Sequence, residues 1–356
     1  MKASLKIWFN FLTAVLFLGL FTQTAFSQEF ERLKNLKGYW KFTIGDDMNW
    51  ADPSYDDSKW EEIRVPAYWE EQGFYGYNGY AWYRKHFDFP RDFDGSTIYI
   101  DLGAIDDIDQ TYLNGKLVGF SGSFPPNYQT AYNAYRHYPV QVKYFNKNDD
   151  NVIAVRVFDS QLGGGICKGN IGLYYVPNAL VADVNLEGNW KFKTGDDKEW
   201  KKPDFNDKDW ATLMVPGYWE SQGYKDYDGY AWYRKAFKAP ADLDNNKLVL
   251  MMGKIDDLDE IYVNGQLVGS TGTMYDNPSR NTHDNNEYAQ FRGYYLPGGL
   301  IKTGQENVIA VRVWDGWING GIYQGPIGLI TQKKYIKFWR ENKSKKNVFE
   351  FFFNWD

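Results

Sequence analysis

The chain of 356 residues contains one sequence pattern twice, and this repeat limits the fold more than any other feature. The segment GYAWYRK occurs at Gly79 and again at Gly229, 150 residues later. Further along, NVIAVRVFD at Asn151 returns as NVIAVRVWD at Asn307, a separation of 156, so the second copy has six additional residues. Two copies of about 140 residues each have the size of ordinary domains, and such a period is too long for a solenoid. The repeat therefore predicts two similar domains in tandem.

Each copy is expected to consist of short β-strands. Runs of β-branched and aromatic residues, such as 97–102 and 152–157, alternate with turn signals, and neither copy shows a helical period. Asn114-Gly115 and Asn264-Gly265 each separate two such runs, and this dipeptide is typical of tight hairpins. Many short strands joined by Gly, Asn and Pro turns indicate a sandwich. The predicted fold class is all-β, with two tandem jelly-roll β-sandwiches.

The first residues have the features of a secretory signal peptide. Lys2 and Lys6 precede an apolar run over 7–21, and Ala-Phe-Ser at 25–27 supplies the small residues of a cleavage site. The run is shorter and less uniform than a membrane span, which needs about 18 apolar residues. No Cys lies at the cleavage site, so lipid attachment there is not expected. We therefore expect a periplasmic or secreted protein with no transmembrane segment in the mature chain.

Beyond the signal peptide at 1–27, the sequence predicts three further segments: a first domain at 28–178, a second domain at 179–332, and a basic and aromatic tail at 333–356. In the tail, Tyr335, Phe338 and Trp339 have helical spacing. We expect a helix and a terminal strand, over 348–355, that dock on the second sandwich or across the domain interface. Attachment to a partner enzyme or to an anionic surface is the alternative.

Composition excludes several classes of function. The net charge of −6 argues against nucleic acid as a partner, because nucleic-acid binding begins with a basic surface. The chain has three His and one Cys, which argues against a zinc site built from His and Cys ligands. A single Cys cannot form an internal disulfide. Aromatic residues make up 19% of the chain, which exceeds what a core requires. The excess points to ring surfaces that bind a ligand.

The order of motifs in both copies resembles a known domain family. The motifs W-x-F, GDD-x-x-W, VP-x-x-W, WYR, IDD-x-D-x-x-Y-x-NG and NVIAVRV resemble the sugar-binding, galactose-binding-like jelly roll of family-two glycoside hydrolases, which include β-galactosidases, β-glucuronidases and β-mannosidases. The same order is similar to the β-sandwich of sialate O-acetylesterases. The resemblance covers roughly 31–175 and 182–330. It implies that the Gly-rich loop after the last long strand, with Asp159 in one copy and Asp315 in the other, faces the sugar.

The resemblance extends to sugar-binding domains and not to the catalytic domains of these enzymes. A catalytic TIM barrel takes about 200 to 250 residues, and no unassigned stretch approaches that length. We therefore predict an exported, non-catalytic carbohydrate-binding protein that acts in glycan recognition or degradation, with an oligo- or polysaccharide as its partner. The alternatives are a glycan-active hydrolase, either a β-galactosidase-like glycoside hydrolase or an esterase, and an accessory subunit of a separate glycan-degrading enzyme.

Saccharide recognition combines a flat aromatic platform with a few charged or amide groups, and loops at one end of a sandwich can supply both. Trp317 is the expected platform, since the first copy has Gln161 in its place. The predicted carbohydrate-binding residues are Glu70, Tyr75, Tyr77, Tyr128, Tyr132, Arg136, Asp159, Glu220, Tyr227, Asp228, Arg292, Asp315, Trp317 and Tyr323. Arg136 and Arg292 have an equally weighted alternative, a salt bridge to Asp159 or Asp315.

Repeated Asp pairs raise the question of catalysis. Glycoside cleavage needs two carboxyl groups about 5 to 10 Å apart, and Asp106-Asp107 returns as Asp256-Asp257. Neighbours on a strand point to opposite faces, whereas Asp107 and Asp109 would share one. Asp residues just before a hairpin also commonly bind backbone N–H groups in a turn. We therefore expect these pairs to have a structural role and assign no catalytic residue.

No resident cofactor is expected. Asp46, Asp47 and Asp57 are predicted to be turn or capping residues, with a weak Ca²⁺ site as the alternative, because hard cations prefer oxygen ligands. His86 and His137 align with Ala236 and Gly293 in the second copy, and His283 lies in an unmatched loop, so no Ser-His-Asp triad is shared between the copies.

Overall fold

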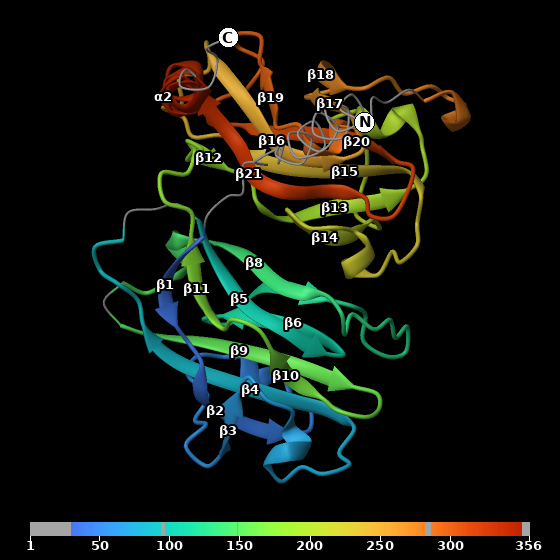
Figure 1. Ribbon diagram of the computed structural model, residues 1–356. Coiled ribbons are helices and arrows are strands. Elements are labelled where there is room, and N and C mark those ends of the chain that lie inside the picture. Colours follow the sequence, from blue (N-terminus) through green and yellow to red (C-terminus); the bar gives the residue numbers. More distant parts are fainter. Residues whose placement is uncertain (1–29, 94–96, 148, 282–285, 351–356) are drawn as a thin grey trace, which may run out of the picture.

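The computed structural model describes residues 30–93, 97–147, 149–281 and 286–350, with backbone alone over 343–350. The predicted signal peptide and His283 therefore lie outside the described residues. Figure 1 shows two β-sandwiches, one above the other. The predicted all-β class is confirmed, and α2 (Gln332–Glu350) is the one α-helix of the described residues.

The first sandwich consists of two antiparallel sheets. One sheet has six strands in the order β3-β2-β4-β9-β6-β7, and the other has the order β1-β11-β5-β10 with β8 also paired to β5. The strands are β1 (Glu31–Asn35), β2 (Gly38–Ile44), β3 (Glu61–Val65), β4 (Gly79–Asp88), β5 (Thr97–Asp106), β6 (Ile108–Leu113), β7 (Lys116–Ser121), β8 (Tyr135–Gln141), β9 (Asp150–Asp159), β10 (Gly165–Lys168) and β11 (Gly172–Tyr175).

The second sandwich repeats this arrangement. Its sheets have the orders β14-β13-β15-β20-β17-β18 and β12-β21-β16-β19. The strands are β12 (Val184–Asn185), β13 (Gly188–Thr194), β14 (Ala211–Val215), β15 (Gly229–Lys238), β16 (Leu248–Asp256), β17 (Leu258–Val263), β18 (Gln266–Thr271), β19 (Arg292–Tyr295), β20 (Glu306–Asp315) and β21 (Gly321–Thr331). Short 3₁₀ helices lie at η1 (Met48–Ala51), η2 (Trp69–Gln72), η3 (Val142–Tyr144), η4 (Lys198–Lys201), η5 (Glu220–Gln222), η6 (Pro278–Arg280) and η7 (Glu287–Ala289).

Much of the aromatic excess proves to be structural. Between the sheets of the first sandwich, Trp40 and Trp69 belong to a large buried core, and the second sandwich has an equivalent core. A smaller aromatic cluster around Trp82 packs with Tyr112 and Trp50, and the second sandwich repeats it around Trp232. Aromatic content by itself is therefore a weaker sign of ligand binding than the sequence indicated.

Each sandwich contains a fully buried ion pair between an arginine and an aspartate. The aspartate is not the one that the sequence analysis considered as the arginine's partner. Arg136 Nε donates to Asp109 at 2.8 Å, and Arg292 Nε donates to Asp259 at 2.8 Å. All four side chains have an exposed fraction of 0%. The expected salt bridges to Asp159 and Asp315 are thus wrong, because β6 and β17 direct Asp109 and Asp259 into the core beside the arginines.

The two sandwiches contact each other through the first part of the second copy. The Gly122 amide donates to the Ser221 carbonyl at 2.9 Å, and Phe120 packs against the second core. Thr97 Oγ1 donates to the buried Glu187 carboxylate at 3.0 Å. The loop of the second copy that contains η5 therefore lies against the first sandwich, whereas its counterpart in the first copy does not have this neighbour.

Helix α2 docks on the second sandwich as expected. Tyr335 and Phe338 pack against a buried cluster that includes Met251 and Ile330 on β16 and β21, and Figure 1 shows the helix beside these two strands. The expected terminal strand is wrong over 348–350, which continue the helix, and 351–356 lie outside the described residues. Among the described residues, no helix combines the length and hydrophobicity needed to cross a membrane.

Replacing Asp259 by Ala should leave the Arg292 guanidinium buried without its carboxylate partner. Removing one member of a buried ion pair costs about 3 to 5 kcal/mol, so we expect a loss of that size in the free energy of unfolding, measured by urea denaturation. Asp242→Ala, at an exposed position, is the control and should change stability by less than about 0.5 kcal/mol. A loss below about 1 kcal/mol for Asp259→Ala would show that the pair is dispensable.

Candidate functional site

Each sandwich has a cluster of three Asp carboxyl groups at one end. In the first sandwich Asp106 ends β5 and Asp159 ends β9, and Asp107 lies in the bend between β5 and β6. The same geometry brings together Asp256, Asp257 and Asp315 in the second sandwich. In both clusters the three carboxylate oxygens lie within 4.8 Å of one another. We refer to these sets as the first and second acidic clusters.

The acidic clusters correct one expectation from the sequence. Asp106 and Asp107 were expected to point to opposite faces of a strand, but their carboxyl groups lie together, as do those of Asp256 and Asp257. The reason is local: β5 ends at Asp106 and β6 begins at Ile108, so Asp107 lies outside both strands. The alternation of an extended strand does not apply in a bend.

A glutamate from the short helix before β4 or β15 joins each cluster. Glu70 accepts a hydrogen bond from the Gly164 amide at 3.1 Å, and Glu220 accepts one from the Gly320 amide at 2.9 Å. Burial raises the pKa of Glu220 to about 7. This contact brings the loop after the last long strand against the loop that carries η2 or η5.

Burial and mutual repulsion make ionisation of the clusters unfavourable. Burial is the largest effect, and it raises the pKa of Asp106 and of Asp159 to about 7 in the first cluster. In the second cluster burial, together with the charge of Asp257, raises the pKa of Asp256 and of Asp315 to about 8. Carboxyl groups in this state either retain protons or need a ligand that compensates their charge.

The first cluster is closed by hydroxyl groups. Asp107 accepts hydrogen bonds from Tyr128 Oη at 2.6 Å, from Thr130 Oγ1 at 2.7 Å, and from the amide and hydroxyl of Ser160 at 3.0 and 2.9 Å. Burial opposes ionisation of Asp107, but these donors outweigh it and lower the pKa of its carboxyl group. The hydroxyl group of the predicted site residue Tyr128 is therefore already engaged in a hydrogen bond within the protein.

In the second cluster the described residues, which do not include 282–285, supply one hydrogen bond to Asp257, from the Gly316 amide at 3.2 Å. Gly316 stands where the first copy has Ser160. Within the part of the chain that the structure describes, Asp315 Oδ2 and Glu220 Oε2 are buried without a hydrogen-bond partner, and so is Asp159 Oδ2 in the first cluster. Asp315 has an exposed fraction of 0%. The second cluster therefore offers unused acceptor oxygens.

An exposed aromatic ring lies at the edge of the second cluster. The side chain of Trp317 is 78% exposed, and its amide donates to Asp315 Oδ1 at 3.4 Å. The next residue, Ile318, is 65% exposed. Two neighbours of an acidic site thus present apolar surface to solvent, as the sequence predicted for Trp317.

A pair of tyrosines forms another wall near the second cluster. The rings of Tyr218 and Tyr323 are stacked, with centroids 4.8 Å apart and planes 6° apart. Tyr323 Oη donates to the Tyr288 carbonyl at 2.8 Å. Both rings also line a cavity of about 250 Å³ between the sandwiches, to which the first sandwich contributes Tyr99 and His137. Tyr323 is thus the second aromatic site residue that the structure places near the acidic groups.

Other predicted residues do not join this site. Tyr77 and Tyr227 donate their hydroxyl groups to the carbonyls of Tyr80 and Tyr230, and their rings pack on Trp69 and Trp219.

The remaining predicted site residues fall into two groups, one exposed to solvent and one buried. Tyr75, Tyr132 and Asp228 are exposed, whereas Arg136 and Arg292 are buried beneath the clusters and bind the carbonyls of Asp107 and Asp257 through Nη2. The four members that the predicted site omitted are Asp106, Asp107, Asp256 and Asp257, and their repetition at equal spacing was the available signal.

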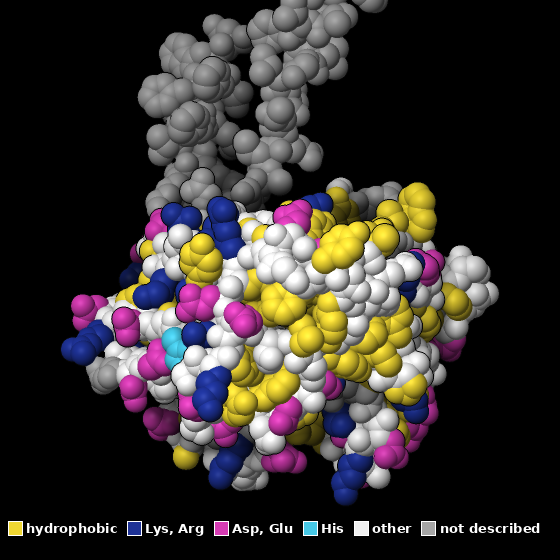
Figure 2. All heavy atoms as spheres, turned by 90° about the horizontal axis from the view of Figure 1, so that it is seen from below, with side chains coloured by type: hydrophobic (Ala, Val, Ile, Leu, Met, Phe, Trp, Pro, Cys, Tyr) yellow, Lys and Arg dark blue, Asp and Glu magenta, His cyan; other side chains and the backbone are white. Residues whose placement is uncertain are grey.

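Exposed hydrophobic side chains also occur away from the clusters. The face of the first sandwich in Figure 2 has hydrophobic groups gathered over one part and charged groups over another. Tyr39, with 66% exposure on β2, and Tyr75, with 92% exposure after η2, belong to the first sandwich. Exposure alone therefore does not identify a binding site, and the second cluster is distinguished by the combination of a free ring with unpaired carboxylate oxygens.

Asp46, Asp47 and Asp57, near the start of the first copy, have partners within the protein. Asp46 binds Arg156, Asp47 caps η1 and Asp57 accepts from Arg84 at 2.7 Å. These contacts agree with the predicted turn or capping role and not with the alternative of a weak Ca²⁺ site, because guanidinium groups neutralise two of the carboxylates.

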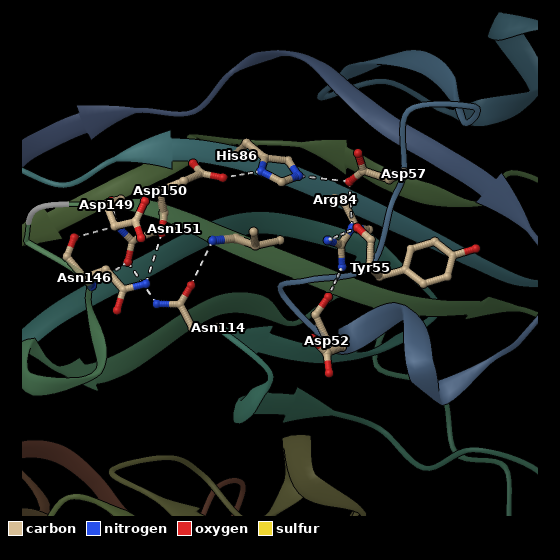
Figure 3. A network of polar contacts seen from close by, with 11 residues as sticks. Asp52, Tyr55, Asp57, Arg84, His86, Asn114, Asn146, Asp149, Asp150 and Asn151 are labelled. Atoms are coloured by element: carbon tan, nitrogen blue, oxygen red, sulfur yellow. Dashed lines mark hydrogen bonds and ion pairs between the residues drawn. The ribbon is translucent and has the colours of Figure 1, made fainter.

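His86 belongs to the same structural network. Figure 3 shows its ring between Asp57 and Asp150, and Nε2 lies 3.0 Å from the Asp57 carboxylate. The second copy has Ala236 at this position and retains the Arg234–Asp207 pair at 2.7 Å. The network therefore holds the outer loop in both copies without needing the histidine, which supports a structural role.

Comparison with known proteins identifies a family match in both sandwiches. The family model described as "Beta-galactosidase second all-beta domain" matches residues 45–162 and 195–316. A β-glucuronidase from Formosa agariphila is 26% identical over 147 residues, which is 36% of this chain and 13% of that protein. A second, putative β-glucuronidase from the same organism is 27% identical over 135 residues, covering 35% of this chain and 12% of its own length. The chain thus spans a small part of the curated relatives it matches.

Solved structures give weaker similarities. The β-glucuronidase of Bacteroides uniformis aligns with 82% of this chain and 28% of its own, with a TM-score of 0.34 and 18% identity. A glycosyl hydrolase family 2 member from Bacteroides cellulosilyticus aligns with 81% of this chain and 32% of its own, with a TM-score of 0.35 and 15% identity. Both scores are low, so these similarities carry no functional argument.

The raised pKa values predict how stability depends on pH. The folded protein binds protons at Asp256 and Asp315 that the unfolded chain releases, so stability is highest in mild acid and falls as pH rises through about 8. In a buffer with a chelator, we expect Tm to fall between pH 6 and pH 9. In Asp315→Asn the fall should be smaller by about 2 to 4 °C, the shift that about 1 kcal/mol produces in a domain of this size. An equal fall in both proteins would contradict the assignment.

Proposed function

Because the chain belongs to the family of the second all-β domain of β-galactosidases, with one match in each sandwich, we propose that it is a carbohydrate-binding protein with its saccharide site at the second acidic cluster. The observation that carries this proposal is the exposed Trp317 ring beside Asp315, whose Oδ2 accepts no hydrogen bond. A ring face suits the C–H face of a sugar, and carboxylate oxygens accept hydrogen bonds from adjacent hydroxyl groups.

The two copies are proposed to differ in binding. In the first sandwich Gln161 replaces the platform Trp317, and hydroxyl groups from Tyr128 and Ser160 already occupy Asp107. A sugar hydroxyl group that binds Asp107 would have to displace one of these internal donors. Because one hydrogen bond would only replace another, the exchange would contribute little to the free energy of binding. The donor that the described residues provide to Asp257 is the Gly316 backbone amide, and Trp317 follows it, so we assign the saccharide to the second sandwich.

We propose a non-catalytic role in glycan recognition or degradation, either alone or as an accessory subunit of a separate glycan-degrading enzyme. The family supports this proposal, because the matching model describes an all-β domain of β-galactosidases. The predicted signal peptide supports a periplasmic or secreted location, where polysaccharides are encountered.

A second candidate function is glycoside hydrolysis at the second cluster. Burial raises the pKa of Asp256 to about 8, so this carboxyl group could act as a proton donor, and the Asp257 carboxyl group lies beside it. Release of sugars from a polysaccharide, lost in a folded Asp257→Asn variant, would support this function over binding alone.

Trp317→Ala should weaken saccharide binding by at least about tenfold, because stacking on the ring and its buried area are lost together. Affinity electrophoresis and calorimetry against galactans, mannans, glucuronans and pectins would measure the change. Tyr75→Ala removes an equally exposed ring in the first sandwich and should leave binding unchanged. Retained binding by Trp317→Ala, or no binding of any panel member by the natural protein, would refute the proposed site.

A further inference from the structure

The cavity between the two sandwiches has walls from both copies. Its volume is about 250 Å³, and the first sandwich contributes Tyr99 and His137 to it while the second contributes Tyr218 and Tyr323. A protein cavity of about 150 Å³ can hold a benzene molecule. The space between the sandwiches therefore exceeds what an unsubstituted six-membered ring needs, and a ring with substituents is the size of ligand that it suits.

Each sandwich lines this cavity with a pair of stacked rings. The rings of Tyr99 and His137 have centroids 4.6 Å apart and planes 11° apart. The rings of Tyr218 and Tyr323 have centroids 4.8 Å apart and planes 6° apart. Flat ring surfaces are the kind of surface on which the C–H groups of a sugar pack. The cavity thus offers such surfaces from both copies.

His137 also supplies a polar atom that the protein does not use. Its Nδ1 lies 3.8 Å from the Asp101 carboxylate. Its Nε2 is buried and has no hydrogen-bond partner among the described residues. An imidazole nitrogen donates or accepts a hydrogen bond according to its protonation, and a buried polar atom without a partner costs free energy. A ligand hydroxyl group that reaches Nε2 would remove this cost.

The second sandwich fills the corresponding face of its own sheet. On β5 and β8, Asp101 lies opposite His137. On β16 and β19, Met251 lies opposite Gly293 at the matching position. A side chain at Gly293 would collide with the Tyr335 hydroxyl group of α2. The face that α2 covers in the second sandwich is therefore lined by an imidazole and open to the cavity in the first.

The charge of the lining limits the class of ligand. Within the described part of the chain, no Asp, Glu, Lys or Arg side chain lines the cavity. A carboxylate that entered would leave water without a Lys or Arg partner, and an unpaired buried charge is costly. A hydroxyl group has a smaller cost and gains the His137 nitrogen as a partner. The lining therefore favours an uncharged sugar over a uronic acid.

We propose that this cavity binds one uncharged pyranose unit of a glycan, with its C–H groups against the stacked rings and a hydroxyl group bonded to His137 Nε2. The inference rests on the proposed function, since it takes the ligand to be a saccharide, and it adds a second site with a defined substrate class. Because Tyr99 and Tyr218 come from different copies, neither sandwich contains the site alone. The tandem arrangement is then a requirement for binding at this position.

Saturation-transfer NMR on the full chain would test the proposal by titration with the methyl glycosides of glucose, galactose, mannose and glucuronic acid. We expect one of the three uncharged glycosides to bind at least about tenfold more tightly than the glucuronide. His137→Phe keeps a ring and removes the nitrogen, so it should weaken this binding about two- to tenfold. Tyr218→Ala removes a stacked ring and should weaken it at least about tenfold.

His86→Ala is the matched control, because the second copy already has Ala236 at this position, and it should leave the binding unchanged. Circular dichroism would show whether each variant folds, and either cavity variant is sufficient if the other does not. Three outcomes would overturn the proposal: no binding of any uncharged glycoside, tighter binding of the glucuronide, or full binding retained by the folded cavity variants.

Titration of Trp317→Ala separates this site from the one at the second acidic cluster. The uncharged glycoside should bind this variant as tightly as it binds the natural protein. Loss of the glycoside in Trp317→Ala would place the sugar at the second acidic cluster, which would overturn this inference and leave the proposed function standing. Polysaccharide binding that persists in Trp317→Ala and is lost in His137→Phe would support the cavity and refute the site at the cluster.

Discussion

The acidic end of each sandwich depends on one buried arginine. Arg292 donates to the Asp259 carboxylate and to the backbone carbonyls of Glu287, Gln290 and Asp257. Arg136 makes the corresponding bonds in the first sandwich. One guanidinium therefore joins β17, the bend before it and the long loop that leads into β19. This fixed donor set holds the bend that carries Asp257, so the acidic cluster is built on the core and not on loops alone.

On this shared frame the two copies have diverged at few positions. Ser160 and Gln161 of the first copy correspond to Gly316 and Trp317 of the second. The first change removes a donor to the cluster, and the second adds an exposed ring at its edge. In each cluster one oxygen of the Asp at the end of the last long strand, Asp159 or Asp315, is buried without a hydrogen-bond partner among the described residues. The exposed ring of Trp317 is present only beside the second of these.

The sequence predicted the fold well because the signals for it are local and repeated. Asn-Gly hairpins, strand-like runs and the two matching segments indicated two all-β domains, and the resemblance to the domains of family-two glycoside hydrolases is confirmed by the family match. The positions of the candidate residues were predicted less well. Trp317 and Tyr323 lie near Asp315, but Arg136 and Arg292 are buried, because a sequence pattern does not show which side of a strand faces the core. The sequence also did not show that the carboxyl groups of each Asp pair lie together, because the bend that brings them together interrupts the alternation on which the prediction relied.

The most direct test of this account is a crystal structure of the protein grown with the saccharide it binds most tightly. We predict that a sugar ring will lie on the indole of Trp317 and that its hydroxyl groups will contact Asp257 and Asp315. The corresponding cluster in the first sandwich should retain its hydrogen bonds from Tyr128 and Ser160 and hold no ligand. A saccharide bound elsewhere, with the second cluster empty, would contradict the account.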